Sequence, residues 1–234
     1  MNIGTVVVTA AFLAAFAQAA PQQYDLRFKP VNGTKTFYDL TWSIDGLEEE
    51  TVYSALLTSE IVDVREDGSY LTASYQTDHK LKVGGEDKTS AAETFTAVTT
   101  YDRLGRPTAI GGDLATPESF RVANLTSFLA PSSPVSVGGS WSVRIRADEE
   151  QGTRDVRHEY RLVGFGKVGG RDAAMVDVSA AEAGGKLPAS TKGRIWIDAE
   201  NGEVLKYEVT VTNMPVGTYA VSGSVLIEKK ADGS

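Results

Sequence analysis

Apolar and polar side chains alternate along most of this chain of 234 residues. The clearest stretches lie at 36–44, 95–101, 141–146, 157–162, 205–212 and 219–227. A period of two places every second side chain on the same face, so one face of each strand is buried and the other is wet. Strands of this kind are typical of antiparallel sheets, whereas buried parallel strands are apolar throughout. The pattern therefore predicts a mainly β protein of about ten antiparallel strands.

Pairs that contain glycine mark the turns between these strands. Asp67-Gly68, Gly169-Gly170 and Asn201-Gly202 each separate two alternating runs. Such pairs supply the positive φ that tight hairpins need, and a looser connection is expected at 102–107. Most strands should therefore pair with their neighbours in sequence. In the last of these hairpins, Trp196 is expected on a core-facing strand, and Leu205, Tyr207, Val209 and Val211 are expected to pack inward.

One helix is expected, at 116–129. Thr116 is placed to cap it, Pro117 suits the first helical position, and Phe120, Ala123 and Phe128 can form its inward stripe. The prolines and glycines of 130–140 then exclude a helix. We predict one β-rich domain over 20–234, with an internal connector near 116–140 between two half-sheets. Two separate domains are the alternative.

The N-terminal segment has the features of a secretory signal. Residues 6–17 form an apolar run too short for a convincing membrane anchor, and Ala17-Gln18-Ala19 is a small-x-small cleavage site. The prediction is a signal peptide over 1–19 and an exported mature chain, periplasmic or extracellular; a buried N-terminal helix is the alternative. No later apolar run is long enough to span a membrane.

Composition narrows the classes of function. The net charge of −8 argues against nucleic acid as a partner, because that affinity comes mainly from clustered Lys and Arg. The absence of cysteine excludes disulfides, thiolate nucleophiles and thiolate metal sites.

No catalytic or metal-binding pattern stands out. His79 lies in a polar stretch interpreted as a connection, and His158 falls on the apolar side of a strand, where a packed or hydrogen-bonded role is expected. Acidic residues are abundant without the spacing of a calcium loop. We therefore expect no catalytic residue, no metal and no cofactor, although a carboxylate pair brought together by folding remains an alternative.

Aromatic residues are the best candidates for ligand contacts. Trp42, Trp141, Tyr160 and Tyr207 come from distant parts of the chain, and each lies on the apolar face of a predicted strand. If the strands form one curved sheet, these faces converge on its concave side, where pockets are mostly apolar with a few polar anchors. The four residues are predicted as ligand-binding.

Two stretches carry a resemblance to known proteins. Residues 134–141, PVSVGGSW, resemble a P-V-x-V-G-x-x-W signature, and residues 193–211 resemble a G-x-x-W-I-D-x-x-x-G-x-x-x-K signature. Together they resemble a family of exported bacterial proteins of unknown function. The W-I-D hairpin is also similar to one in the outer-membrane lipoprotein carriers. That resemblance implies a curved antiparallel sheet or half-open β-barrel, which in the carriers holds acyl chains, and it implies no catalytic residues.

The leading hypothesis is an exported, non-enzymatic protein that binds an apolar small molecule or a protein segment across a curved sheet. A structural or envelope-associated interaction protein without a small-molecule site is the second hypothesis. A carboxylate-based hydrolase is the third. The sequence does not indicate the oligomeric state.

Overall fold

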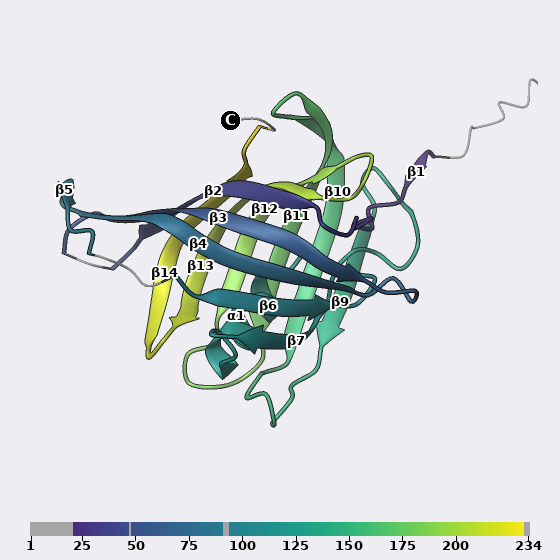
Figure 1. Ribbon diagram of the computed structural model, residues 1–234. Helices are drawn as coiled ribbons and strands as arrows, with labels where there is room; N and C mark the ends of the chain where they lie inside the picture. Colours follow the sequence, from purple (N-terminus) through teal and green to yellow (C-terminus); the bar gives the residue numbers. More distant parts are fainter. Residues whose placement is uncertain (1–20, 47, 91–93, 232–234) are drawn as a thin grey trace, which may run out of the picture.

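The computed structural model describes residues 21–46, 48–90 and 94–231 (Figure 1). The predicted signal peptide, 1–19, lies outside the described residues. Within the described part of the chain, α1 (Pro117–Thr126) is the only helix, and neither its length nor its hydropathy suits it to crossing a bilayer.

Strands make up most of the structure. Among the described residues, seven strands precede the helix: β1 (Gln23–Tyr24), β2 (Lys35–Ile44), β3 (Thr51–Val64), β4 (Tyr70–Val83), β5 (Glu86–Asp87), β6 (Thr96–Tyr101) and β7 (Pro107–Gly112). The helix is followed by β8 (Val135–Ser136), β9 (Ser140–Ile145), β10 (Val156–Val168), β11 (Arg171–Glu182), β12 (Ser190–Asp198), β13 (Val204–Val216) and β14 (Tyr219–Lys229).

The main sheet consists of two antiparallel meanders joined side by side. Its order is β7-β6-β4-β3-β2-β14-β13-β12-β11-β10-β9, with the short β5 also paired to β4, so that 12 strands belong to it. Within the described part of this main sheet, only the pairing of β2 with β14 joins strands that are distant in sequence, and it runs from Tyr38–Lys229 to Ile44–Gly223. The remaining pair, β1 with β8, forms a separate two-stranded sheet. The predicted class, a curved antiparallel sheet with one short helix, is confirmed.

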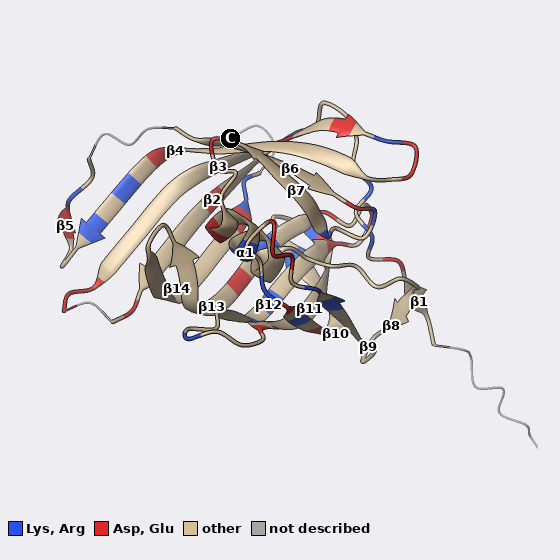
Figure 2. Cartoon of the chain, turned by 90° about the horizontal axis from the view of Figure 1, so that it is seen from below, with Lys and Arg blue, Asp and Glu red and all other residues tan. Residues whose placement is uncertain are grey.

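The sheet curves without closing, since β7 and β9 are its two edges and do not pair. The chain passes from one edge to the other through α1 and the connector that follows it. The helix lies on the concave side between the β2–β4 strands and the β11–β13 strands (Figure 2), where it contacts β7 and each strand from β10 to β13. Thr116 caps the helix, because its hydroxyl accepts a hydrogen bond from Ser119 N at 3.2 Å, and Pro117 begins it.

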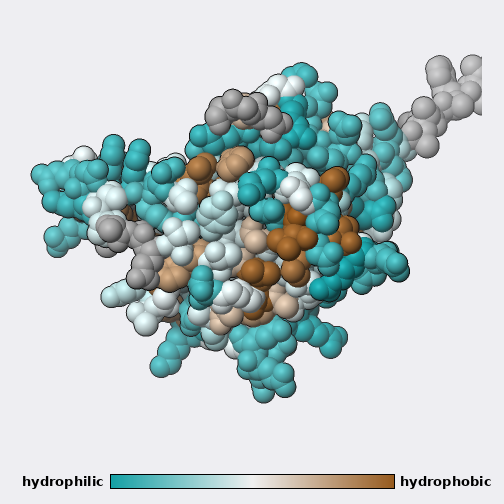
Figure 3. Space-filling model, in the orientation of Figure 1, coloured by the Kyte–Doolittle hydropathy of each residue, from teal (hydrophilic) through white to brown (hydrophobic). Residues whose placement is uncertain are grey.

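The main hydrophobic core lies between the helix and the β9–β14 half of the sheet. Leu125 and Leu129 pack there against Leu162, Val176 and Ile195, all of which are 1% exposed or less. The helix ends at Thr126 rather than at 129, so Phe128 lies beyond it; the buried helical residues are Phe120, Asn124 and Leu125, and Ala123 is only partly buried. The outer face of the other half of the sheet is mostly hydrophilic, with apolar surface near its centre (Figure 3).

The hairpins are confirmed, with turns at Asp67-Gly68, Gly169-Gly170 and Asn201-Gly202. Two local interpretations are wrong. His79 belongs to strand β4 rather than to a connection. Trp196 points to the outer face, where the Lys206 ammonium lies 5.0 Å from its ring centroid, while its neighbours Ile195 and Ile197 are the buried residues.

Candidate ligand-binding cavity

A cavity of about 350 Å³ lies on the concave side of the sheet. Its walls come from β2, β3, β4 and β6 on one side and from β13 and β14 on the other, and residues 126–130 at the end of α1 contribute as well. The lining combines aliphatic side chains with the rings of Tyr38, Tyr70, Tyr101 and Tyr207 and with several serine and threonine hydroxyls. We call it the concave cavity.

Residues 25–34, which we call the strap, cover one side of this cavity. The Lys29 amide donates to the Asn201 carbonyl at 2.8 Å, and the Gly33 amide donates to the Ile61 carbonyl at the same distance. The Phe28 ring packs edge-on against Tyr70, with centroids 5.5 Å apart. The strap therefore connects the turn of the β12–β13 hairpin to strand β3.

The turn at Gly202 is shaped to receive the strap. Gly202 has a φ of 75°, a conformation that favours glycine. A Cβ at this position would lie 2.7 Å from the Phe28 amide nitrogen and closer still to the Arg27 carbonyl. The close approach of the strap backbone to this turn is thus a second reason why position 202 requires glycine.

Tyr207 is the least exposed polar residue of the lining. It is 5% exposed, and its hydroxyl has no hydrogen-bond partner among the described residues. Burial raises the pKa of Tyr207, and a hydrogen-bonding interaction with the Thr191 hydroxyl, too poor in geometry to count as a full hydrogen bond, lowers it in part. That hydroxyl itself donates to the Leu125 carbonyl at 3.1 Å. Since a buried hydroxyl without a partner is costly, Tyr207 is a natural contact for a polar atom of a ligand.

Among the described residues that line the cavity, Glu203 is the one carboxylate, and neighbouring groups balance its charge. One carboxylate oxygen accepts from the Thr36 hydroxyl at 2.9 Å. The other accepts from Lys229 Nζ at 2.7 Å and from Arg171 Nη1 at 3.2 Å. Arg171 also pairs with the buried Asp198 at 2.8 Å. This network fixes the start of β13 beside the strands that form the wall.

Lys29 brings a cation to the edge of the concave cavity. Its ammonium donates to the Glu200 carbonyl at 2.7 Å, and an ammonium has three protons to donate. Lys29 therefore has donors left for an acidic group of a ligand.

The predicted ligand residues Trp141 and Tyr160 lie elsewhere. Their rings stack with centroids 5.0 Å apart, and Phe128 packs edge-on against both. Trp141 Nε1 donates to the Leu129 carbonyl at 2.9 Å, and the Tyr160 hydroxyl accepts from the Leu129 amide at 3.2 Å. These polar groups are engaged in holding the connector against the sheet.

His158 completes the same attachment. It is fully buried, its Nε2 donates to the Asn124 carbonyl at 2.7 Å, and its Nδ1 lies 3.0 Å from the Tyr160 hydroxyl. Burial lowers the pKa of His158 to about 4, although the bond to Asn124 opposes this shift. The packed, hydrogen-bonded role predicted for His158 is confirmed.

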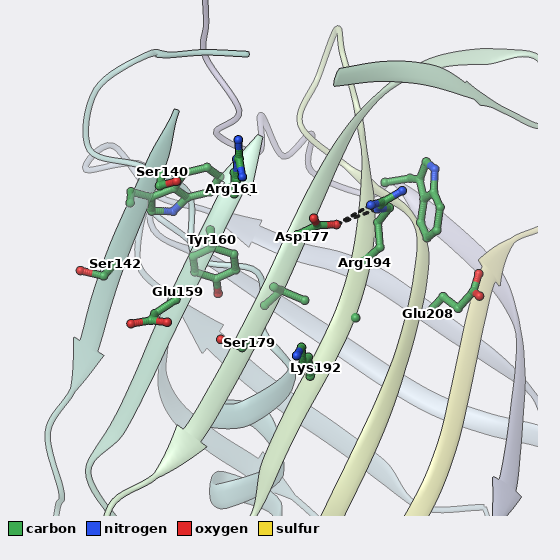
Figure 4. A pocket seen from close by; sticks show the side chains of 14 residues that line it. Ser140, Ser142, Glu159, Tyr160, Arg161, Asp177, Ser179, Lys192, Arg194 and Glu208 are labelled. Carbon is green, nitrogen blue, oxygen red and sulfur yellow. Dashed lines mark hydrogen bonds and ion pairs between the residues drawn. The ribbon is translucent and has the colours of Figure 1, made fainter. Parts of the chain in front are cut away.

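The outer face of β9–β13 has a second, open depression of about 1000 Å³, which Trp141 and Tyr160 also help to line (Figure 4). A row of charged side chains of alternating sign crosses this face on successive strands, each opposite the next: Arg161, Asp177, Arg194 and Glu208. Figure 4 shows Asp177 and Arg194 paired, at 2.7 Å. Opposite charges across neighbouring strands stabilise a sheet surface, and this accounts for the row without a ligand.

The fourth predicted residue, Trp42, lies on the concave face next to the cavity lining. Leu40 and Tyr38 precede it on the same face of β2, and Tyr38 lines the cavity. Trp42 Nε1 is buried without a hydrogen-bond partner among the described residues. Of the four predicted residues, Tyr207 lines the concave cavity, Trp42 lies on the same face, and Trp141 and Tyr160 hold the connector.

Sequence reasoning missed the strap and three of the cavity tyrosines. Tyr38 and Tyr101 follow the alternating pattern and were open to the same argument as Tyr207. The strap carries no periodic pattern, so no local signal marks it. No group of three or more His, Asp or Glu side chains in the described residues is arranged to hold a metal ion.

Comparison with known proteins identifies no family. No family model matches the chain, and no curated protein matches it. A solved structure that is similar to the chain is a candidate exported protein with a YmcC-like fold from Bacteroides fragilis, at 10% identity and a TM-score of 0.39 over 88% of this chain and 100% of that one. Another is DynF from the dynemicin biosynthesis pathway of Micromonospora chersina, at 9% identity and a TM-score of 0.24 over 97% and 92% of the two chains. Similarity at this level assigns neither a family nor a function.

Proposed function

We propose that this is an exported, non-enzymatic binding protein that holds a small amphipathic molecule, apolar over most of its length, in the concave cavity. The observation that carries the proposal is a cavity of about 350 Å³ whose lining combines aliphatic and aromatic side chains with hydroxyl groups, among them the Tyr207 hydroxyl, which lacks a full hydrogen bond among the described residues. Pockets for small molecules are typically apolar with a few polar groups that fix orientation.

Size favours a small molecule over a protein segment. A cavity of about 350 Å³ holds on the order of ten non-hydrogen atoms, given that water occupies about 30 Å³ in the liquid. The strap and the connector border it with hydrogen-bonded backbone, which leaves little room for an extended peptide.

The polar groups suggest how such a ligand is oriented. The Tyr207 hydroxyl can bond one polar atom deep in the cavity, and the Lys29 ammonium at the edge can bond an acidic group. A medium-chain fatty acid with its carboxylate at Lys29 satisfies this arrangement. The only carboxylate in the lining is Glu203, which is already bonded to a hydroxyl and two cations, whereas glycoside hydrolysis normally uses two carboxylates. This argues for binding rather than hydrolysis.

An environment-sensitive apolar dye tests the proposal. The folded mature protein should enhance the fluorescence of the dye, and saturated fatty acids of increasing chain length should displace it, best at medium length. Ser59→Phe fills the cavity from β3, because Ser59 is part of the lining, and should abolish dye binding. Val62→Phe is the matched control, since Val62 is an exposed residue of the same strand at 47%. A dye that stays dark with the folded protein, or that binds equally to Ser59→Phe, would overturn the proposal.

The Lys29→Met variant tests the contact with the carboxylate of the fatty acid separately from the contacts with its hydrocarbon chain. The variant should bind octanoate about tenfold to a hundredfold more weakly, for the loss of one charged hydrogen bond, and should bind octanol as the parent protein does. Equal affinities of Lys29→Met and the parent for octanoate would place the carboxylate elsewhere.

A further inference from the structure

A β-bulge in strand β4 turns His79 onto the concave face. Opposite Ala55 of β3, the partner strand has two residues, Asp78 and His79, because the register shifts between Ser54 and Leu56. Gln76 and His79 are three residues apart, so a regular strand would place them on opposite faces. The extra residue brings both onto the face of Tyr53. Bulges of this kind re-aim side chains and are common next to functional sites.

The bulge is held in a conformation unfavourable for its own residue. Asp78 has a φ of 52°, one of two positive values among the described non-glycine residues. Such a conformation persists where the surrounding structure over-determines it.

The re-aimed His79 forms a hydrogen-bonded chain with its neighbours. The Tyr53 hydroxyl donates to Gln76 Oε1 at 2.8 Å, and it lies 2.6 Å from His79 Nδ1. A hydroxyl has a single proton to donate, so the bond between Nδ1 and the Tyr53 oxygen takes its proton from the imidazole. In the neutral ring, His79 Nε2 is then an acceptor.

Two polar atoms flank this chain without partners. His79 Nε2 and Trp42 Nε1 are both buried and make no hydrogen bond among the described residues. Trp42 stands directly opposite Tyr53 on the neighbouring strand, and the Tyr53 and His79 rings are 6.0 Å apart between centroids. Trp42, Tyr53 and His79 are each only partly buried as residues, so the cluster combines an unpaired acceptor and an unpaired donor with partly exposed rings.

We propose that Trp42, Tyr53 and His79 form a second binding site, distinct from the concave cavity, for a neutral hydroxyl-bearing molecule such as an alcohol or a glycoside. A hydroxyl can donate to His79 Nε2 and can accept from Trp42 Nε1–H, and a sugar also presents C–H groups to the Trp42 and Tyr53 rings. A carboxylate has no proton to donate to Nε2 and is disfavoured.

Nuclear magnetic resonance of the intact mature protein tests this site without any variant. The chain has two histidines and three tryptophans, so each ring can be assigned. Octyl glucoside and octanol should shift the Trp42 indole N–H and the His79 ring nitrogens. The rings of His158 and Trp141, whose polar atoms are already bonded, serve as internal references and should not shift. Octanoate, with the same chain length, should leave all four unchanged.

Matched variants then assign the contacts. Trp42→Phe and His79→Phe should each weaken octyl glucoside binding by about tenfold, and Trp196→Phe, on the outer face, should not. Asp78→Gly preserves the bulge and should keep the affinity, whereas Asp78→Val, whose branched side chain resists a positive φ, should lose it. The Ser59→Phe variant blocks the concave cavity and should leave the response of Trp42 and His79 intact.

Two results would overturn the site. If neither alcohol nor glycoside moves the Trp42 and His79 signals, the two atoms bond only to water. If octanoate moves them as strongly as octyl glucoside does, the site does not select a hydroxyl. Whether the concave cavity binds a ligand is tested separately by the dye experiment.

Discussion

The contact between Gly202 and the strap offers a sharp test of how the cavity is closed. Gly202→Ala adds one methyl group where φ is 75° and where Phe28 N would lie 2.7 Å away. The left-handed conformation alone costs an alanine about 1–2 kcal/mol. The strap must also move, which breaks the bond from Lys29 N to the Asn201 carbonyl, worth about 1 kcal/mol. This movement partly exposes the strap residue Leu26, which is 1% exposed in the parent protein, and costs about 1 kcal/mol more.

The free energy of unfolding should therefore fall by about 3–4 kcal/mol, and the melting temperature by about 6–16 °C at the usual ratio for chains of this size. Gly184→Ala is the matched control, because Gly184 has a φ of 79° and a Cβ there would meet nothing within 4 Å. It should cost only the conformational part, about 1–2 kcal/mol.

Urea unfolding of the three proteins, at one pH and temperature, measures both effects. The difference between the two variants isolates the strap, and it should be about 2 kcal/mol. Equal losses of stability in the two variants would refute the reasoning, since they would show that the strap does not rest on this turn. Dye affinity measured in parallel should fall for Gly202→Ala and stay unchanged for Gly184→Ala.

Three further predictions concern pH and processing. Burial lowers the pKa of His158 from 6.5 to about 4. As the pH falls, this histidine is therefore protonated in the unfolded chain before it is protonated in the folded protein, and the free energy of unfolding should drop by up to about 3 kcal/mol between pH 6.5 and 4. In urea titrations, His158→Gln should lack this part of the pH dependence. Burial of Glu182 works to raise its pKa, but the Arg121 hydrogen bonds and the other partners outweigh burial and hold the pKa below 4.5. The stability that Glu182 contributes is complete above pH 4.5 and is lost as the pH falls through the lower pKa of the folded state. Glu182→Gln should therefore destabilise the protein at neutral pH, and its free energy of unfolding should fall less steeply in acid. N-terminal sequencing of exported protein should begin at Ala20, and a mature chain that retains residues 6–17 would contradict the cleavage site.

Local patterns explain why most of the fold was predictable. Period-two alternation depends on which face of a strand is exposed to water, and the turn pairs depend on φ at one or two residues. Both signals therefore come from residues that are close together in the sequence. The same applies to the helix, whose cap at Thr116 and whose first residue, Pro117, are recognisable without tertiary structure. Sequence reasoning therefore placed the hairpins and the start of α1 correctly, although the helix ends at Thr126 rather than at 129.

Features that depend on distant contacts were not predictable in this way. The strap is held by bonds such as that of Lys29 Nζ to the Glu200 carbonyl, 171 positions away, and its own residues show no pattern. The bulge at His79 is set by pairing with β3, so a sequence with two polar residues there was interpreted as a connection. Trp196 was misplaced because a strand with one buried face still carries aromatic residues on the other.

The same limit explains why the predicted ligand residues have different roles although they share a face. Trp42, Val209, Tyr160 and Trp141 belong to a single row of directly opposed residues that crosses the sheet through Val225, Gly193 and Val178. Periodicity identifies the face of such a row and nothing else. At one end, the connector after α1 covers the row, and the polar atoms of Trp141 and Tyr160 bond to its backbone.

At the other end of the row, the indole nitrogen of Trp42 is buried but has no hydrogen-bond partner among the described residues. Equivalent aromatic residues therefore become structural or available according to where the chain crosses between the open edges β7 and β9. A sheet that closed between those edges would not need this crossing on its concave side, and small closed barrels fill their interiors with side chains. The unclosed sheet, with one helix covering one half, is thus the physical reason that the β2–β4 half can offer both a cavity and unpartnered polar groups.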